Sequence, residues 1–405
     1  MSVVGTLSEP NAGEEPVAAD ERQGIHNEMT DKDAVRVKER AITAAMARGA
    51  GAVRVAPARP DERSRARMEA AFGRGDFATW RYDGAYARRA ADPGSLLPGA
   101  RSVVCVAVPY AVPARARSPL RGRVSNYAWS YDYHRRLGAL LRAVAAEIDD
   151  AAGRPVTAVA CDTRPVAERA FAARAGLGWI GKHTNLIAPR FGSFVFLGEI
   201  VTTLDLPPDA PSRKSCGTCA VCVDACPTGA LRGDYTIDAN RCISDLTQRT
   251  DAIPIEMRAL IGDWVWGCDI CQLVCPPTAR ASHAGGSEWA PFDEECARPA
   301  LVELLALRSG GFKRRYERTA MGWRGAAVLR RNAAVALGNA LDRSTVAALT
   351  QSLERDPHPM VRGHVAWALG RIGSPSAVTA LRSRYPVERD ASVRDEIAAA
   401  LKGIA

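Results

Sequence analysis

The sequence predicts an α+β protein in which an N-terminal α/β domain precedes a cysteine-rich module and a C-terminal helical repeat. Three observations support this order. Strand-like and helix-like runs alternate over residues 34–211. Eight of the eleven cysteines lie between Cys216 and Cys275. Similar helical segments recur towards the C-terminus. These observations divide the chain into a tail at 1–33, the α/β domain at 34–211, the cysteine-rich module at 212–278, a connector at 279–299 and the repeat at 300–405.

The composition is that of a globular protein without a membrane segment. Of the residues, 47% are hydrophobic and 24% are charged, and the net charge is +9. This balance is too apolar for a disordered chain, and the longest apolar runs are about half of the roughly 20 residues that span a membrane. The start of the chain lacks the basic and apolar regions of a signal peptide. We therefore expect a soluble, cytoplasmic protein.

The first two segments differ in pattern. Residues 1–33 are rich in Glu, Asp, Pro, Gly and Ala, which predicts a flexible acidic tail. A helical pattern begins at Ala34, and β-branched and aromatic residues then predict strands between helices. The predicted strands are 102–108, 156–160 and 193–203, and the predicted helices are 132–148 and 165–175. This mixture predicts an α/β or α+β domain.

The cysteine spacing predicts two iron–sulfur clusters in a ferredoxin-like module. Cys216, Cys219, Cys222 and Cys226, followed by Pro, form the C-x2-C-x2-C-x3-C-P run of bacterial ferredoxins. A second, shorter run at the end of the module consists of Cys268, Cys271 and Cys275, followed by Pro. It lacks one cysteine of the full pattern, which Cys242 can supply. Because the fourth cysteine of such a run ligates the other cluster, the runs exchange ligands. One [4Fe–4S] cluster would take Cys216, Cys219, Cys222 and Cys275, and the other would take Cys226, Cys242, Cys268 and Cys271.

Structural zinc is the alternative for these cysteines. Zinc sites prefer two C-x2-C pairs with four ligands per metal, so the run of three closely spaced cysteines followed by C-P favours iron–sulfur. Eleven cysteines are too few for a disulfide scaffold of this length. The remaining three, Cys105, Cys161 and Cys296, are expected to be small buried residues.

The C-terminal segment contains an internal repeat. The segments VLRRNAAVALGNA, MVRGHVAWALGRI and SVRDEIAAALKGI align with Arg330, Arg362 and Arg394 at a spacing of 32 residues. Apolar residues recur at helical intervals within each unit. A helix pair repeated at a fixed period is typical of an α-solenoid, and the pattern is similar to HEAT repeats.

The segment AGLGWIG matches G-x-G-x-x-G at Gly176, Gly178 and Gly181. A dinucleotide site would need these glycines directly after a strand, but here they follow a helix-like run. We expect them instead to allow a close approach of the backbone to something large.

Several motifs in order resemble the epoxyqueuosine reductase family. They are SNYAWSYDYH, CDTRPVAERAFAARAGLGWIGKHTNLI, FVFLGEI, CGTCAVCVDACPTGAL, RCISDLT and WGCDICQLVCP, with LRRNAAVALGN and VRGHVAWALGRIG in the repeat. The resemblance covers about residues 100–375. It implies a cobalamin cofactor in the α/β domain and reduction of the epoxide of epoxyqueuosine to queuosine at the wobble position of a tRNA. Cobalamin needs low-potential electrons, which two clusters fed by an external donor can supply.

The resemblance assigns Asp132 of the D-Y-H motif as the proton donor beside the cofactor. The tyrosines around it and Trp129 could keep the acid partly desolvated and protonated. The alternative is that Asp132 caps the following helix, as Asp readily does. Tyr131 stands where the family usually has a basic residue.

The other cofactor contacts implied by the resemblance are Asp162, Thr163, Lys182 and, more weakly, Ser244. The alternative for the first three is a helix cap with a solvated lysine. The chain departs from the family pattern with Arg164 in place of Gly and His183 in place of Asn.

A basic segment with interleaved aromatic residues predicts an RNA-binding surface. Between Arg308 and Arg331 there are eight basic residues and one acidic residue, Glu317, with Phe312, Tyr316 and Trp323 among them. Such a mixture suits phosphate contacts and stacking, although a charged run is often only a solvated face. The predicted tRNA contacts are Lys313, Arg314, Arg315, Arg318, Arg330 and Arg331.

Two other functions remain open from the sequence. A cobalamin and iron–sulfur reductase of a small molecule, similar to reductive dehalogenases, would use the same clusters but would leave the basic solenoid without a role. An electron-transfer protein with a docking solenoid would need neither cobalamin nor Asp132. One chain contains every part that the tRNA reaction requires, so we expect a monomer.

Overall fold

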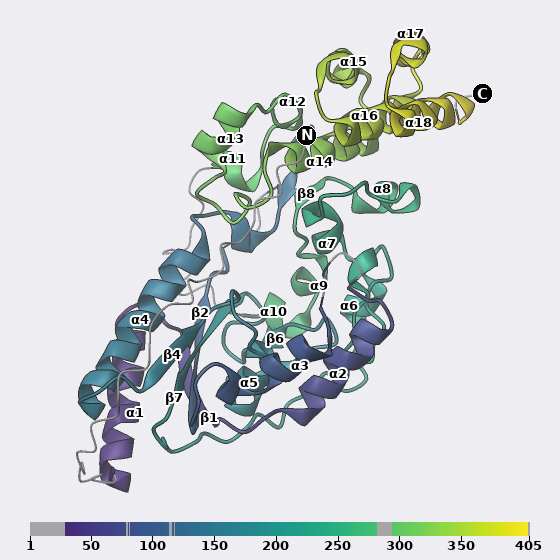
Figure 1. The fold of residues 1–405 in the computed structure, drawn as a ribbon. Coiled ribbons are helices and arrows are strands. Elements are labelled where there is room, and N and C mark those ends of the chain that lie inside the picture. The colour runs from purple at the N-terminus through teal and green to yellow at the C-terminus, as the bar shows by residue number, and fades with distance from the viewer. Residues whose placement is uncertain are drawn as a thin grey trace.

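The computed structural model describes residues 29–77, 80, 82–112, 116, 118–281 and 294–403. In Figure 1 a sheet with its helices, a group of short helices and an extended row of longer helices follow one another along the chain. Residues 1–28 of the expected tail and 282–293 of the expected connector lie outside the described residues. Within the described ranges, no helix is both long and apolar enough to cross a membrane.

A four-stranded antiparallel sheet forms the core of the N-terminal part, with the order β1-β2-β7-β4. The central pair runs in register from Ser102 opposite Thr202 to Pro109 opposite Val195. The strands are β1 (Ala52–Pro57), β2 (Ser102–Pro109), β4 (Thr157–Ala160) and β7 (Val195–Thr202). The predicted strands 102–108, 156–160 and 193–203 are therefore confirmed, and β1 is an additional edge strand.

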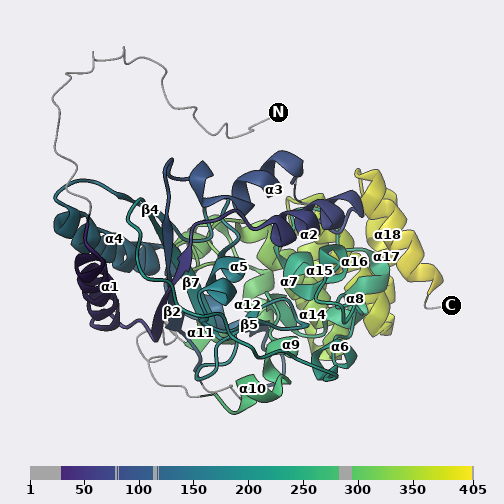
Figure 2. The same ribbon diagram turned by 90° about the horizontal axis from the view of Figure 1, so that it is seen from below.

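Helices cover both faces of this sheet, which explains why every residue of β2 is buried. Val104, Val106 and Val108 pack with α1 (Asp31–Met46) and α4 (Tyr133–Ala152). The alternate residues of β2 pack with α5 (Glu168–Arg174) on the opposite face. Figure 2 shows α1 and α4 together on one side of the strands. The predicted helices 132–148 and 165–175 correspond to α4 and α5. The remaining helices of this part are α2 (Glu62–Gly73) and α3 (Gly84–Ala91).

Two of the three glycines of the G-x-G-x-x-G match, Gly176 and Gly178, lie against the chain's own backbone, and Gly181 lies against the side chains of Ile187 and His183. A Cβ atom at Gly176 would lie 2.2 Å from the carbonyl oxygen of Ala210, and one at Gly178 would lie 2.2 Å from that of Ile187. The segment follows α5 and leads into a hairpin of β5 (Trp179–Ile180) and β6 (Leu186–Ile187). A close backbone approach is present at Gly176 and Gly178, but the groups approached are the chain's own segment at Ala210 and strand β6.

The cysteine-rich part consists of short helices tied to the N-terminal part by a strand pair. β3 (Arg123–Val124) pairs in parallel with β8 (Trp264–Trp266), which directly precedes Cys268. The guanidinium of Arg123 lies 4.4 Å from the ring centroid of Trp264. The helices are α6 (Val221–Asp224), α7 (Ile243–Gln248), α8 (Ile255–Ile261), α9 (Ile270–Leu273) and α10 (Pro276–Ala279).

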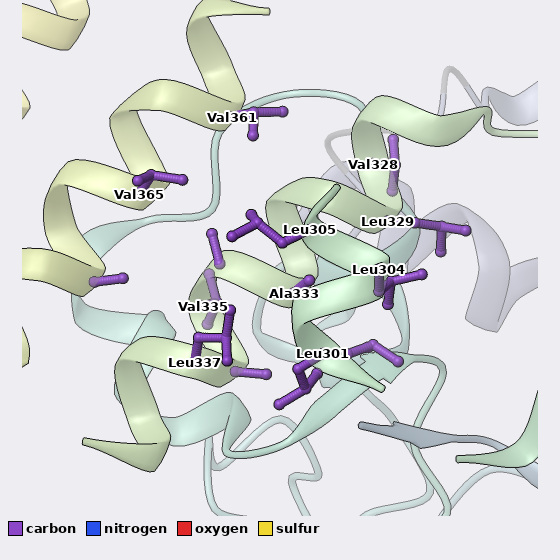
Figure 3. Close-up of a cluster of buried hydrophobic side chains, with 14 of the residues drawn as sticks. Leu301, Leu304, Leu305, Val328, Leu329, Ala333, Val335, Leu337, Val361 and Val365 are labelled. Carbon is purple, nitrogen blue, oxygen red and sulfur yellow. The ribbon is translucent and has the colours of Figure 1, made fainter. Parts of the chain in front are cut away.

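The C-terminal part is a row of helix pairs around an apolar core. Figure 3 shows Leu301, Leu304 and Leu305 packed among valines of two later helices. α14 packs against α16, and α16 packs against α18. The helices are α11 (Glu294–Ala297), α12 (Leu301–Leu305), α13 (Ser309–Arg315), α14 (Ala326–Ala340), α15 (Val346–Arg355), α16 (Pro359–Ile372), α17 (Pro375–Arg384) and α18 (Ala391–Lys402).

The repeated arginine connects one helix pair to the next. Arg330 bonds the carboxylate of Asp356, 26 residues further on, and Arg362 bonds Glu388 at the same separation. Asp356 lies just before α16, and Glu388 lies just before α18. Gly338 allows the close contact of adjacent inner helices, because a Cβ atom there would lie 2.8 Å from Cα of Ala368. The repeat in the sequence therefore reflects packing between units.

Candidate active site

The eight clustered cysteines divide into two neighbouring groups. Burial raises the pKa of the Cys222 thiol, and nearby Cys275, Cys216 and Cys219 raise it further. This group contains three thiols of the first run and the last thiol of the second. The exchange of ligands predicted from the spacing is thus consistent with the three-dimensional arrangement of the first set.

The second group shows the same effect. Burial raises the pKa of Cys268, and Cys242 and Cys226 add to the shift. Burial likewise raises the pKa of Cys271, with further contributions from Cys268 and Cys242. Among the described residues, no three His, Cys, Asp or Glu side chains are gathered closely enough to hold one metal ion.

A cavity of about 430 Å³ lies between this second cysteine group and the N-terminal part. We call it the cluster-side cavity. Three of the cysteines, Cys242, Cys268 and Cys271, line one side. Other lining residues come from the α/β part and from α7; they include Tyr110, Tyr127, Asn185, Ser193, Ser244 and Gln248. The cavity therefore offers apolar ring surface and hydrogen-bonding groups next to three cysteine side chains.

His183 lies at the wall of the cluster-side cavity as a neutral, buried imidazole. Its side chain is 2% exposed, and burial lowers its pKa to about 4. Nδ1 accepts a hydrogen bond from the backbone N–H of Asn185 at 3.2 Å. Nε2 therefore carries the hydrogen, and it has no partner among the described residues. An unsatisfied buried donor at a cavity wall fits a site that binds a cofactor with acceptor groups.

Asp132 is the N-cap of α4, as the alternative interpretation predicts. Its Oδ1 accepts from the backbone N–H of His134 at 3.1 Å and lies 2.6 Å from Nδ1 of the same residue. Nε2 of His134 lies 3.2 Å from Oδ2 of Asp162. One imidazole therefore joins the predicted proton donor to a predicted cofactor contact.

The electrostatics of this group correct one expectation. Burial alone would raise the pKa of Asp132, but hydrogen bonds and charge from His134 outweigh it and lower the pKa. Burial likewise opposes charge on His134, yet Asp132 and Asp162 raise its pKa to about 9. The expectation that neighbouring aromatic rings keep Asp132 protonated is wrong for this conformation, because the adjacent imidazolium favours the carboxylate.

Asp162 stands in a backbone conformation that few residues adopt. Its φ is +54°, in the left-handed region where Asn and Asp are enriched. Oδ2 accepts a hydrogen bond from the hydroxyl of Tyr133 at 2.8 Å, and the Tyr133 ring stacks on Phe196 with centroids 4.2 Å apart. The turn after β4 and the start of α4 are therefore fixed to each other and to the sheet.

The predicted RNA-binding residues fall into two groups. Lys313, Arg314 and Arg318 are exposed on α13 and the turn after it, whereas Arg315 is half-buried and paired with Glu303. Trp323 is 53% exposed. The other two aromatic residues of the segment, Phe312 and Tyr316, are buried and belong to the core.

The prediction of tRNA contacts is wrong for Arg330 and Arg331. Arg331 is fully buried, and its guanidinium donates to the carbonyls of Leu246, Arg249 and Asp251. Arg330 pairs with Asp356 between repeat units. Both side chains are committed to the fold, so neither presents a free cation to a phosphate.

Three segments match known protein families. Residues 90–163 match the epoxyqueuosine reductase QueG family, residues 215–278 match a 4Fe-4S double cluster binding domain, and residues 325–402 match HEAT repeats. A curated Bacillus cereus protein named epoxyqueuosine reductase is 37% identical over 311 residues, which cover 76% of this chain and 82% of the relative. The chain belongs to the epoxyqueuosine reductase family.

Solved epoxyqueuosine reductase structures share the whole architecture. One, in complex with an epoxyqueuosine-modified stem loop of tyrosine tRNA, has a TM-score of 0.86 at 32% identity and covers 92% of this chain and 99% of its own. Another, from Bacillus subtilis with its catalytic aspartate loop swung out of the active site, has a TM-score of 0.85 at 32% identity and covers 92% of this chain and 100% of its own. The likeness thus extends N-terminal to the region of about 100–375 on which the sequence resemblance rested.

The predicted cofactor residues of this epoxyqueuosine reductase family member do not all meet at one cavity. Ser244 lines the cluster-side cavity, together with His183. Thr163 and His134 line a separate groove beside α4 and β4. Asp132, Asp162 and Lys182 are not among the residues that line either space. The predicted set is therefore distributed around α4 and the hairpin segment.

Sequence reasoning missed His134 and His183 as site residues. His134 is the last residue of the D-Y-H motif, and its spacing from Asp132 was the available signal. His183 was noted only as a departure from the family pattern, and its burial could not be read from the sequence.

Proposed function

We propose that this chain reduces the epoxide of epoxyqueuosine to queuosine at the wobble position of a tRNA, with electrons passing through two [4Fe–4S] clusters to cobalamin. The observation that carries the proposal is the cluster-side cavity, whose walls combine Cys242, Cys268 and Cys271 with side chains of the α/β part. Membership of the epoxyqueuosine reductase family supports the same reaction.

The residues present fit a cobalamin in this cavity. Ser244, Gln248 and Asn185 offer polar groups at its wall, and Nε2–H of His183 is an unsatisfied donor there. Tyr110 and Tyr127 contribute ring surface. When bound, cobalamin would supply a strongly reducing metal centre for breaking the C–O bonds of the epoxide. The resemblance adds Asp132, Asp162, Thr163 and Lys182 as residues that the cofactor approaches.

The role of the chain's own groups is to control protons and access. Asp132 would hand a proton to the oxygen that leaves the ring, because a positioned general acid lowers that barrier. Its Oδ1 is held by His134, which leaves Oδ2 without a hydrogen bond among the described contacts. Tyr127 and Trp129, both largely shielded from solvent, flank the segment that carries the acid.

The tRNA would contact the exposed basic residues Lys313, Arg314 and Arg318, with Trp323 available for stacking. This surface begins directly beside the segment that carries Asp132. A solved relative bound to an epoxyqueuosine-modified tRNA stem loop supports such a substrate.

The proposal divides the chain by role: 34–211 bind cobalamin, 212–278 bind the clusters and 300–405 bind tRNA. The first cluster would use Cys216, Cys219, Cys222 and Cys275, and the second Cys226, Cys242, Cys268 and Cys271. An external low-potential donor would reduce the clusters of a monomeric, cytoplasmic enzyme. Thiols reserved as cluster ligands suit a reducing compartment.

The test is an anaerobic assay on tRNA that contains epoxyqueuosine. Protein with both clusters is incubated with a strong one-electron reductant, with and without cobalamin, and digested nucleosides are analysed by mass for loss of one oxygen. Cobalamin-dependent conversion is expected. Corrinoid binding without conversion would favour a different substrate, and the absence of both would leave an electron-transfer protein.

A further inference from the structure

Three side chains form a continuous hydrogen-bonded array at the start of α4. Nδ1 of His134 lies 2.6 Å from Oδ1 of Asp132, and Nε2 lies 3.2 Å from Oδ2 of Asp162. The side chains of Asp132 and His134 are 30% and 31% exposed, and that of Asp162 is 60% exposed. Both ring nitrogens of His134 are therefore held by carboxylates, and solvent can still reach the imidazole.

The surroundings favour a positive charge on this ring. Besides its own members, the titratable and charged groups that interact with the array come from every element around it: Tyr82, Tyr86 of α3, Tyr127, Tyr133 and Arg135 of α4, Cys161 after β4, Glu168 and Arg169 of α5, and Glu199 of β7. Arg142, Asp149 and Arg164 line the groove beside His134. In the part of the chain that the structure describes, only Asp132 and Asp162 contact the ring nitrogens, and both are carboxylates. Tyr133 stacks on the ring with centroids 4.0 Å apart and donates its hydroxyl hydrogen to Asp162.

The reaction needs more protons than one carboxylic acid can hold. Removal of an epoxide oxygen as water consumes two electrons and two protons, because both C–O bonds break and a C=C bond forms. Asp132 carries at most one proton at a time. It must therefore be reloaded for every turnover, and the donor nearest to its carboxylate is Nδ1 of His134.

We propose that His134 stores the proton that loads Asp132, and that Asp162 positions and stabilises the imidazolium that carries it. This inference rests on the proposed function. His134 acts through Asp132, and Asp162 acts through His134.

In the loading step the N–H bond at Nδ1 of His134 breaks and an O–H bond forms at Oδ1 of Asp132. The positive imidazolium and negative carboxylate become a neutral imidazole and a neutral acid. Asp132 then releases the proton to the leaving oxygen and returns to the carboxylate. Solvent reprotonates Nδ1, and the two electrons come from the external low-potential donor of the proposed function.

The charge state of the ring agrees with this role. The two carboxylates raise the pKa of His134 to about 9, so that it is charged at neutral pH. The store is full below this pKa and empties as the pH rises through about 9. Loss of Asp162 as a partner moves this transition to lower pH.

Three variants test the array in the full-length holoenzyme. His134→Gln keeps a hydrogen-bonding side chain but cannot carry the proton, and His134→Ala leaves space for added imidazole. Asp162→Asn keeps a side chain that tolerates the left-handed backbone. The matched control is His358→Gln, an exposed histidine at the start of α16.

The first readout is independent of turnover. Histidine resonances are titrated by NMR in the wild type, in Asp132→Asn and in Asp162→Asn. A His134 pKa near 9 that falls in both variants is expected. An ordinary pKa that neither variant moves would overturn the proposal.

The second readout is the rate as a function of pH. We expect the wild-type rate to fall above pH 9 and His134→Gln to be about a hundredfold slower. In Asp162→Asn, the fall in rate with rising pH should begin at a lower pH than in the wild type. Added imidazole should restore part of the activity of His134→Ala. If His134 had a purely structural role, its substitution would slow the reaction by the same factor at every pH, and added imidazole would not restore activity.

The two proposals fail in different ways. If the wild type does not convert epoxyqueuosine, the proposed function is wrong. If the wild type converts it and His134→Gln does so with an unchanged pH profile, only the proton store is wrong.

Discussion

The backbone N–H of Asp132 donates a hydrogen bond to the carbonyl oxygen of Arg318 at 2.9 Å. Tyr131 forms an antiparallel bridge with Thr319, and the guanidinium of Arg318 lies 5.1 Å from the ring centroid of Tyr131. The residue proposed to donate the proton and a residue proposed to contact tRNA are thus joined through the backbone. RNA bound at Arg318 would bear directly on the segment that carries Asp132.

Replacement of Asp132 by Asn should abolish most epoxide reduction. The amide cannot release a proton, so we expect a loss of about 10²–10⁴-fold in turnover. Iron content, cobalamin binding and tRNA affinity should be unchanged. Asp150→Asn, at an exposed position near the end of the same helix, is the control and should retain activity. Wild-type rates in Asp132→Asn would exclude the proton-donor role.

Paired cysteine substitutions should reveal which thiols share a cluster. Cys219→Ser with Cys275→Ser removes two ligands of one set, so about half of the iron should remain. Cys219→Ser with Cys226→Ser lies within one run but affects both sets, so nearly all iron should be lost. Iron analysis and EPR of the reduced proteins measure this, with Cys296→Ser as the control. Equal iron in the two double variants would contradict the exchange of ligands.

Charge reversal on α13 should weaken tRNA binding. Lys313→Glu with Arg314→Glu removes two exposed cations, and each lost phosphate contact should reduce the slope of log K against log salt by about 0.7 to 0.9. Binding is measured across a salt series. Arg382→Glu on α17 provides the matched control. If the double variant and the control have the same slope, the RNA surface lies elsewhere.

Arg331 should affect stability and leave RNA affinity unchanged. Arg331→Leu would leave the carbonyls of Leu246, Arg249 and Asp251 without their donor, which costs about 3 kcal/mol or more in the free energy of unfolding. Arg331→Lys should recover only part of this, because lysine lacks the planar fork. Thermal unfolding and tRNA binding by the folded protein separate the two roles. Weaker binding with unchanged stability would restore Arg331 to the RNA surface.

Glu388 should make the C-terminal repeat sensitive to acid. Burial opposes its charge, but hydrogen bonds from Arg362, the backbone and Arg384 lower its pKa from 4.5 to about 2. A depressed carboxyl pKa stabilises the fold above pH 4.5, and this contribution disappears as the pH falls towards 2.

Glu388→Gln should therefore lower the free energy of unfolding by about 3 kcal/mol at pH 7. The difference from the wild type should shrink as the pH falls below 5. Helical circular dichroism during denaturant unfolding between pH 7 and pH 3 measures both. A difference that is constant over this range would show that the ionisation of Glu388 does not stabilise the repeat.

The sequence predicts features that depend on local spacing. The strand at β2 could be recognised because its apolar, valine-rich residues form one continuous run, which suits a strand covered by helices on both faces. The double-cluster domain could be predicted because its ferredoxin run has a characteristic cysteine spacing. The N-cap position of Asp132 follows from its residue type before a helical pattern.

Other features depend on pairs far apart in the chain. Arg330 lies in a basic segment typical of nucleic-acid contacts. Its actual partner, Asp356, is 26 residues away in another repeat unit. Arg331 points into the cluster module, and nothing in its neighbourhood in the sequence indicates burial. The protonation state of Asp132 depends on the contact of its carboxylate with the His134 ring, which favours the charged form. The aromatic residues near Asp132 in the sequence suggest a protonated acid instead.

The division of the cysteines has a consequence for how the holoprotein is made. Cys275 and Cys226 each belong, in the proposed assignment, to the set dominated by the other run. In that assignment, a nascent chain that ends before Cys271 would hold three of the four thiolates of each set and could complete neither cluster. Neither cluster would therefore be completed before the second cysteine run has been synthesised and folded back on the first, which couples maturation of the enzyme to closure of this segment.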